Sequence, residues 1–461
     1  MNSPHMYNQS GHLYGLSRRQ ILKLAGVAGT VDLLGVVALL AGCGGNGGAP
    51  ADQGQEQVQL VYQDWRTAWF SPMVEEMMEK FHETHPNIRV FFTPDPRGLA
   101  DIMLEQMKAG TAPDVFQGCC AYFPIWAQEG FTLDLRPFIE RDLDGSITAE
   151  WDPAQYASFL TSGGQRYAVP KYHGALALYY NKDLFDEYGV AYPDGSWDHD
   201  DYLSAMRQLT QDHDGDGSTD LWGSMIDVSW DRIQVHVNGW GGHLVDPDDP
   251  TVCGMAEPEA MEALEWIRAS IWDDGVMASS LDVQGQGTRD AFMGGRLAMV
   301  EDGSWALKDI LANADFRVGV AAFPSGPVRR VTLATTDGFG IFAGTEHPEE
   351  AWELVKFLIS EDFGRAMARA NFLQPARETL VDEWVTIIRD EFPEKAAEVD
   401  IRAFADGHIN GYSVTAEVFV NMKDARRIAL DAWDRILTLG QSPLEDIRTA
   451  CDQIQQAQTP R

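Results

Sequence analysis

One short acidic segment, residues 212–220, has the residue spacing of a metal-binding loop. Its sequence is DHDGDGSTD, with acidic side chains at relative positions 1, 3, 5 and 9. The glycine at position 6 permits a tight turn, and the backbone carbonyl at position 7 can supply another oxygen. This pattern predicts a calcium site, because Ca²⁺ prefers oxygen ligands. The expected ligands are Asp212, Asp214, Asp216, Ser218 and Asp220.

The loop departs from the EF-hand pattern at its end. Position 12 is Gly223, where an EF-hand has a bidentate glutamate. A bound ion would therefore need a further oxygen from elsewhere in the chain. The alternative is an acidic turn that is solvated and binds no ion.

Aromatic residues in polar segments form a second group of candidates. Trp230 and Trp240 lie in stretches rich in Gly and Asp, and Tyr412 follows Gly411 in another such stretch. Aromatic residues on loops often bind ligands, so we expect these rings to be exposed and to contact a ligand. Ordinary packing in the core is the alternative for three further aromatic candidates described below, Trp65, Tyr122 and Trp305.

The segment from residue 58 to residue 122 predicts a β-α-β-α-β unit. Its strands are expected at 58–62, 88–93 and 114–117, with helices opening at Ser71 and near residue 99. In such a sheet the loops after the carboxyl ends of the strands form a binding crevice. Asp64, Trp65 and Tyr122 follow two of these strands and are therefore candidate ligand contacts.

A second segment, residues 164–188, predicts a connection between two domains. A strand over 167–170 ends at Pro170, and a second apolar run covers 175–180. Between them lies the short polar sequence KYHG, whose glycine allows the backbone to bend. The length of 461 residues independently favours at least two domains.

Two sets of motifs carry a resemblance to a known family. The first is Tyr-x-x-Pro at 167–170 with Ala-Leu-x-Tyr-Asn-Lys-Asp-Leu-Phe at 177–185. The second is Phe-x-x-Gly-x-x-Ala-Met at 292–299 with Gly-x-Trp at 303–305. Together they resemble the extracellular solute-binding proteins of carbohydrate ABC importers, the maltose-binding-protein-like family 1. The resemblance extends over nearly all of residues 57–458 but does not specify the ligand.

The resemblance implies a two-lobed α/β fold, the class II periplasmic-binding-protein fold, with a ligand cleft between the lobes. One lobe is expected to contain residues 57–172 and 325–372, and the other residues 173–324 and 373–461. Trp305 would stack on a sugar, and Asp337 would lie at the cleft edge. The expected protein is a monomer that delivers a sugar or oligosaccharide to a membrane permease. Some family members hold a structural calcium ion in a loop like 212–220.

The N-terminal residues predict export and a lipid anchor. Ser17-Arg18-Arg19 begins a twin-arginine pattern, and an apolar stretch covers 24–40. The sequence LAGC at 40–43 resembles a lipobox, so residues 1–42 are predicted to be a signal peptide and Cys43 to be lipidated on the outer face of the membrane. Residues 43–56 would form a flexible tether. A transmembrane helix is the alternative, but Asp32 lies within the apolar stretch.

Charge and cysteine usage restrict the class of ligand and the chemistry. The formal net charge of −35 argues against nucleic acid and against a polybasic membrane contact. The four remaining cysteines, Cys119, Cys120, Cys253 and Cys451, form no Cys-x-x-Cys motif, so free thiols or one long-range bridge are expected. We expect a receptor and not an enzyme. An extracellular glycoside hydrolase and a receptor for a polyamine or other cation are the alternatives.

Overall fold

The computed structural model describes residues 57–119, 122–161 and 163–458. The predicted signal peptide, Cys43 and the tether lie outside the described residues, as does Cys120. Among the helices that the structure describes, none combines the length and the apolar character needed to cross a membrane.

The first lobe is built on a five-stranded mixed sheet. β1 pairs in parallel with β2 and β3, whereas β12 is antiparallel to β3 and β4. The predicted β-α-β-α-β unit is confirmed, with α2 (Phe70–Thr84) and α3 (Leu99–Lys108) between its strands. In sheet order the strands are β2 (Ile88–Pro94), β1 (Val58–Asp64), β3 (Val115–Gly118), β12 (Gly338–Ile341) and β4 (Val169–Pro170).

Apolar side chains at helical spacing attach α2 to this sheet. Val74, Met77, Met78 and Phe81 are buried in the same core as Leu60 of β1. Positions three and four residues apart share one face of a helix, which explains why this stripe faces the sheet. Burying it removes a large apolar area from water and fixes the strand ends that border the cleft.

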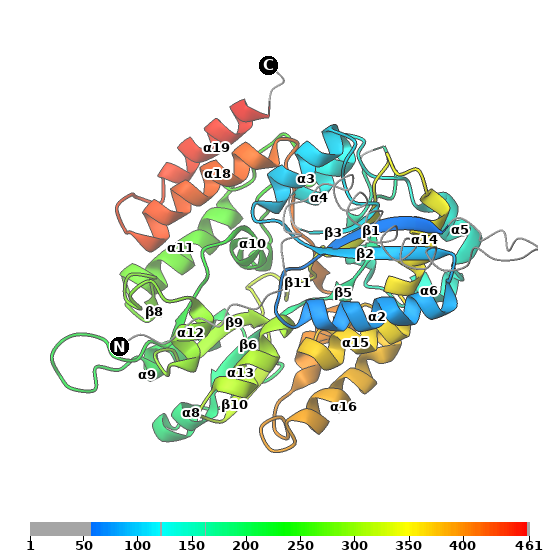
Figure 1. Ribbon diagram of the computed structural model, residues 1–461. Helices are drawn as coiled ribbons and strands as arrows, with labels where there is room; N and C mark the ends of the chain where they lie inside the picture. The colour runs from blue at the N-terminus through cyan, green and yellow to red at the C-terminus, as the bar shows by residue number, and fades with distance from the viewer. Residues whose placement is uncertain (1–56, 120–121, 162, 459–461) are drawn as a thin grey trace, which may run out of the picture.

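The second lobe contains an antiparallel three-stranded sheet in the order β10-β6-β9. Its central strand, β6 (Leu176–Asn181), is buried at all six positions, which matches the predicted uncharged run. The flanking strands are β9 (Met299–Gly303) and β10 (Val318–Ala322). Figure 1 shows helices α10 (Trp230–Gly239), α11 (Pro258–Trp272), α18 (Met422–Trp433) and α19 (Asp446–Ala457) gathered on this side of the molecule.

A disulfide bond joins Cys253 to Cys451, 198 residues apart in the sequence. It ties α19 to the loop that precedes α11, so it lies within the second lobe. The long-range bridge considered from the sequence is therefore present.

Three chain segments connect the two lobes. The first contains β5 (Tyr172–His173), the second contains β11 (Thr332–Leu333), and the third contains β13 (Gln374–Pro375), which is antiparallel to β5. At Gly174 a Cβ atom would lie 2.7 Å from Thr335 Cγ2, so a glycine is required where the first two segments touch. The predicted two-lobed α/β fold is thus observed.

Candidate functional site

A cavity of about 440 Å³ lies between the lobes, and all three connecting segments reach its wall. The first lobe contributes two tryptophans, and the second lobe contributes Trp305 and two arginines. Such a cavity falls within the size range of small-molecule sites. The bordering residues are Trp65, Thr67, Trp69, Tyr172, Asp231, Arg232, Arg289, Trp305, Leu333, Thr335, Asp337, Asn371 and Leu373.

The wall on the first lobe rests on a buried ion pair. Lys171 and Asp64 are both fully buried and in direct contact, and Tyr62 donates a further hydrogen bond to Asp64. The Lys171 ammonium lies 3.1 Å from the centre of the Trp65 ring, a cation–π contact that supports the indole from behind. The Tyr172 ring meets Trp65 edge-on, with centroids 5.5 Å apart.

Burial and charge oppose one another in this ion pair. Burial raises the pKa of Asp64 and lowers that of Lys171, whereas their mutual attraction favours the charged form of both groups. Because both side chains are held inside the lobe, the orientation of Trp65 is fixed before any ligand arrives.

Asp337 borders the cavity beside this pair and is 8% exposed. Burial raises the pKa of Asp337 to about 7, with a further rise from the negative charge of Asp64, while Lys171 opposes the shift. The neighbouring Asp95 behaves alike, since burial and the Asp64 charge raise its pKa to about 7. Lys171 is thus the cation near three carboxyl groups, and burial raises the pKa of two of them, Asp95 and Asp337.

The wall on the second lobe is organised by Asp302 on β9. Arg289 Nε donates to Asp302 Oδ2 at 2.9 Å, and Arg232 Nη2 lies 3.4 Å from Asp302 Oδ1. Trp305 follows two residues after β9, and its ring lies over Gly303, where a Cβ atom would come within 2.3 Å of it. The Arg232 guanidinium is 5.5 Å from the Trp305 ring centre.

Three of the predicted contact residues meet at this cavity, namely Trp65, Trp305 and Asp337. Asp64 lies beneath Trp65 and is fully buried, so it positions the wall and does not border the cavity. Tyr122 lies on α4 (Tyr122–Gln128) against Trp126, and Tyr412 donates to Asp406 at 2.5 Å. Neither of these two tyrosines is among the residues that border the cavity.

The predicted exposure of Trp230 and Trp240 is wrong. Trp230 is the first residue of α10, is 3% exposed, and packs on Trp433. Trp240 follows the last residue of the same helix, is 8% exposed, and packs on His199. Their polar neighbours indicated loops, but the intervening residues form a buried helix that carries both rings into the core.

Several cavity residues were missed by reasoning from the sequence. Trp69 comes four residues after Trp65, and Tyr172 belongs to the predicted hinge, so both had a local signal. Arg232 and Asp231 lie in the first turn of α10, directly after Trp230. Arg289 lies on α12 (Thr288–Met293), and only its partner Asp302 could have indicated its position.

The acidic loop at 212–220 is exposed, and its backbone N–H groups donate hydrogen bonds to the loop's own carboxylates. The side chains of Asp212, Asp214 and Asp216 bring oxygens within 4.8 Å of one another. Asp212 accepts hydrogen bonds from the backbone N–H groups of residues 215 and 217, and Asp220 accepts one from residue 213. Three converging carboxylates fit a hard cation such as Ca²⁺, whereas Asp220 faces the backbone in this arrangement.

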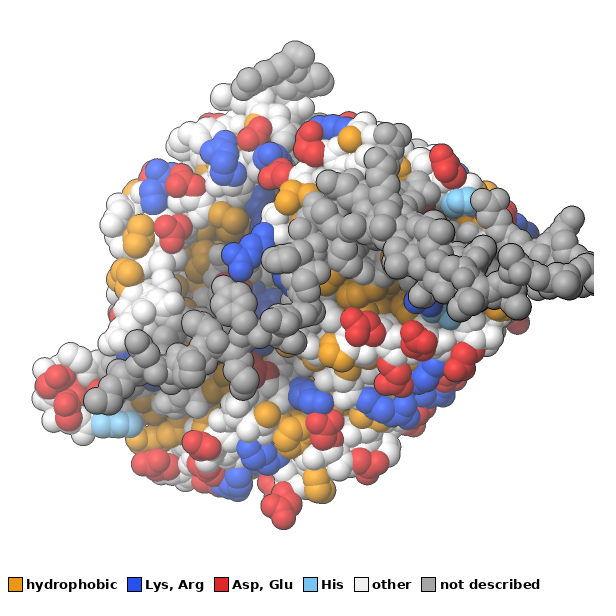
Figure 2. Space-filling model, in the orientation of Figure 1, with side chains coloured by type: hydrophobic (Ala, Val, Ile, Leu, Met, Phe, Trp, Pro, Cys, Tyr) orange, Lys and Arg blue, Asp and Glu red, His pale blue; other side chains and the backbone are white. Residues whose placement is uncertain are grey.

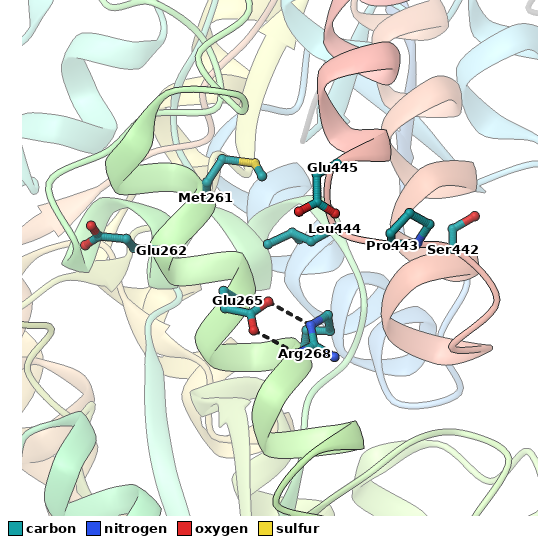
Figure 3. A pocket seen from close by; sticks show the side chains of 8 residues that line it. All are labelled: Met261, Glu262, Glu265, Arg268, Ser442, Pro443, Leu444 and Glu445. Carbon is teal, nitrogen blue, oxygen red and sulfur yellow. Dashed lines mark hydrogen bonds and ion pairs between the residues drawn. The ribbon is translucent and has the colours of Figure 1, made fainter.

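A larger hollow, about 610 Å³, lies on the outside of the second lobe (Figure 3). Met261, Glu265 and Arg268 of α11 form one side, and the segment from Ser442 to Glu445 forms the other. Because its wall comes from one lobe only, a molecule bound there would not hold two lobes together. Figure 2 shows acidic and basic side chains intermingled over the visible face of the molecule.

The fold and the cavity define a class of protein that holds a small molecule between two lobes. Residues 64–364 match the family described as bacterial extracellular solute-binding protein, and the chain belongs to that family. Membership confirms the resemblance found in the sequence and identifies an exported binding protein, not an enzyme.

Relatives and solved structures agree with this assignment. A putative binding protein of Brucella abortus is 27% identical over 337 residues, covering 70% of this chain and 75% of the relative. The multiple sugar-binding protein of Streptococcus mutans is 23% identical over 361 residues, covering 74% and 80% respectively. The ABC substrate-binding protein of Listeria monocytogenes, solved with cycloalternan, shares the fold with a TM-score of 0.75 at 24% identity, covering 87% of this chain and 99% of that chain.

Proposed function

We propose that the protein is the lipid-anchored receptor of a carbohydrate ABC importer. It captures a sugar or oligosaccharide between its lobes and presents the closed form to a membrane permease. The observation that carries this proposal is the placement of Trp65 and Trp305, from different lobes, on one cavity. The multiple sugar-binding protein and the cycloalternan complex described above support the choice of a saccharide.

The chemistry of the cavity suits a polyhydroxylated ring. Indole faces cover its apolar C–H surfaces, while carboxylates accept and guanidinium groups donate hydrogen bonds to hydroxyls. Asp337 supplies an acceptor on one side, and Arg232 supplies donors on the other. A ligand that engages both favours the closed arrangement, because only there can it contact both lobes at once.

The anchor and the permease complete the proposal. Cys43 would carry the lipid, and residues 43–56 would allow the folded lobes to reach the permease. Mass spectrometry of the protein from bacterial membranes tests the anchor, and a diacylglycerol adduct on a chain beginning at Cys43 is expected. A chain that retains residues 1–42 would contradict it.

A thermal-shift panel tests the ligand class. We expect one or more mono- or oligosaccharides to raise the melting temperature without being cleaved, since a ligand that binds only the folded state stabilises it. Released sugar would indicate a hydrolase. A response to spermidine with no response to any saccharide would indicate a cation receptor, for which Asp231 and Asp337 would supply the charge.

We further propose that the loop at 212–220 binds one structural calcium ion through Asp212, Asp214 and Asp216, with oxygens of Ser218 and Asp220 completing the set. Removing the ion would leave three carboxylates to repel one another. We therefore expect chelation with EGTA to lower the melting temperature by a few degrees and added calcium to restore it. The variant Asp214→Asn should be insensitive to EGTA. A wild-type melt unchanged by EGTA would contradict the site.

A further inference from the structure

The two-stranded ribbon of β5 and β13 separates the cavity from a buried polar cluster. Tyr172 and Leu373 of the ribbon segments border the cavity. His173 and Gln374 come next in each segment and are directly paired across the ribbon. Because successive residues of a strand point to opposite faces, His173 and Gln374 face away from the cavity. The same ribbon therefore lines the cavity with one face and lines the buried cluster with the other, through His173 and Gln374.

Three potential ligands converge there. Asp152, His173 and His408 are 1%, 0% and 7% exposed, and each offers one oxygen or nitrogen atom within 4.8 Å of the others. His173 Nε2 lies 3.4 Å from Asp152 Oδ2, and the two imidazole rings are stacked with centroids 4.9 Å apart. The cluster draws one residue from the first lobe, one from the first connecting segment and one from α17 (Asp406–Asn410).

The polar atoms of this cluster have few partners. His173 Nδ1 and His408 Nδ1 make no hydrogen bond within the described residues, and His173 Nε2 has only the Asp152 carboxylate nearby, at 3.4 Å. The side-chain nitrogen and oxygen of Gln374 also make no hydrogen bond within the described residues. Buried polar atoms are normally satisfied, and an orphaned set usually has an unseen partner, such as a water molecule or an ion. The orphaned set is concentrated around one point, next to a carboxylate.

We propose that Asp152, His173 and His408 bind one divalent transition-metal ion, with zinc as the best match. Two imidazoles and a carboxylate are a common zinc donor set, whereas calcium and magnesium prefer oxygen alone. Gln374 Oε1, on the strand paired with His173, or a water molecule can take the fourth position. The site is thus chemically distinct from the exposed, all-oxygen loop at 212–220.

The surroundings already orient one ligand. Asp152 caps the N-terminus of α7 (Pro153–Ser158), and its Oδ1 accepts a hydrogen bond from Gln155 N at 2.9 Å. This bond leaves Oδ2 directed toward His173, which is the kind of outer contact that holds metal ligands in place. Ligand atoms around tetrahedral zinc lie about 3.4 Å apart. His173 Nε2 and Asp152 Oδ2 already have this separation, so these two ligands need little movement to bind an ion.

The ion would cross-link separate parts of the chain behind the hinge. Asp152 belongs to the first lobe and His408 follows the third connecting segment, so one ion would add a link between the first lobe and the part of the chain beyond that segment. Binding would couple folding stability to zinc concentration, as in other proteins whose ligands come from separate segments. This inference does not depend on the nature of the ligand in the cavity.

Crystals of the metal-loaded full chain test the proposal directly. The protein is prepared with one equivalent of ZnCl₂ and excess calcium, and anomalous diffraction is collected at the zinc edge. We expect one peak among the side chains of Asp152, His173 and His408. A water molecule at that position without anomalous signal, or zinc peaks only on surface residues, would overturn the proposal.

Titration against a chromophoric zinc chelator tests the same site in solution. The variants His408→Gln and Asp152→Asn are expected to weaken zinc binding by at least about 10-fold. Asp214→Asn, which alters only the calcium loop, is the matched control and should bind zinc as the wild type does. Unchanged zinc affinity in both folded site variants would also overturn the proposal, and thermal melts of all variants identify any that fail to fold.

Discussion

The two walls of the cleft are supported in different ways. On the first lobe, Trp65 rests on Lys171, whose charge is matched by Asp64 inside the protein. On the second lobe, Arg232 and Arg289 both contact the Asp302 carboxylate, and Arg289 also lies 3.6 Å from Asp309. The cation of the first wall is paired inside the protein, without a ligand. The second wall presents the side chains of Arg232 and Arg289 at the cavity, where a ligand can accept hydrogen bonds from them.

The two walls therefore have different roles: the first provides a rigid surface, and the second provides hydrogen-bond donors that recognise the ligand. A preformed wall lowers the cost of ordering the site, because its side chains are already fixed. A wall with unmet donors gains hydrogen bonds when hydroxyl groups arrive, so it contributes more to the difference between the open and closed states. We therefore expect substitutions on the first wall to lower mainly the free energy of unfolding. Substitutions on the second wall should lower mainly the affinity for the ligand.

The largest effect on stability is expected from Lys171→Met. It would leave the Asp64 carboxylate buried without its cation, and breaking a buried pair in this way costs about 3–5 kcal/mol. Urea denaturation of the unliganded protein measures the change. Adding Asp64→Asn should recover part of the loss, since the second substitution removes the stranded charge.

Arg232→Met is the matched control, because it removes a cation from the other wall. Asp302 keeps Arg289, so the free energy of unfolding should fall by only about 1 kcal/mol. Ligand affinity should fall by roughly 10-fold or more through the lost donors. Equal decreases in the free energy of unfolding for Lys171→Met and Arg232→Met would contradict the proposed difference between the walls.

Trp305→Ala should abolish the ligand response with a smaller effect on folding. The ring is only partly buried but packs at the junction of three core clusters. We expect the unliganded protein to lose about 1–2 kcal/mol, less than full burial of a tryptophan would imply. Thermal melts with and without the best saccharide measure both quantities. If the ligand still raised the melting temperature of the variant, residues other than Trp305 would be responsible for binding it.

Asp337→Asn is expected to stabilise the protein, unlike the variants above, and its effect depends on pH. The folded pKa of about 7 lies above the ordinary value of 3.8, so the folded wild type holds a proton that the unfolded chain releases between these values. Its stability therefore falls as pH rises through this window and levels off above it. The amide cannot ionise, so at about pH 8 the variant should be more stable than the wild type, by up to about 4 kcal/mol for a shift of roughly three pKa units.

Melting temperatures at intervals from about pH 4 to pH 8 check this prediction. The advantage of Asp337→Asn should vanish toward the acidic end, where both states of the wild type are protonated. A constant difference across the range would show that Asp337 does not titrate in this window.

Much of the fold could be predicted from the sequence because its signals are local. Apolar periodicity located α2, and the uncharged run at 175–180 located the central strand of the second sheet. The pairing of β11 and β12 could not be predicted, because their partner strands are distant in the sequence. In the structure β11 pairs with β14 (Ser413–Val414) and β12 with β3 and β4, so one extended run serves two sheets.

The site could be predicted only in part, for a physical reason. Trp65 follows a strand and Trp305 follows a short motif, so neighbouring residues indicated their roles. Burial depends on residues distant in sequence. Trp230 is covered by Trp433, and Asp64 by Lys171, and neither partner can be inferred from nearby residues. The partly buried Arg289 was missed because only the assembled lobe brings it to Asp302.

The position of β12 has a consequence for how the protein is made. Residues 338–341 form an interior strand of the first sheet, between β3 and β4, whose own residues are synthesised far earlier. The leading half of a nascent chain therefore emerges from the ribosome with a gap in its sheet that only a much later segment can fill. Until then one edge of β3 and one edge of β4 lack their partner strand, and unpaired strand edges favour pairing with other chains.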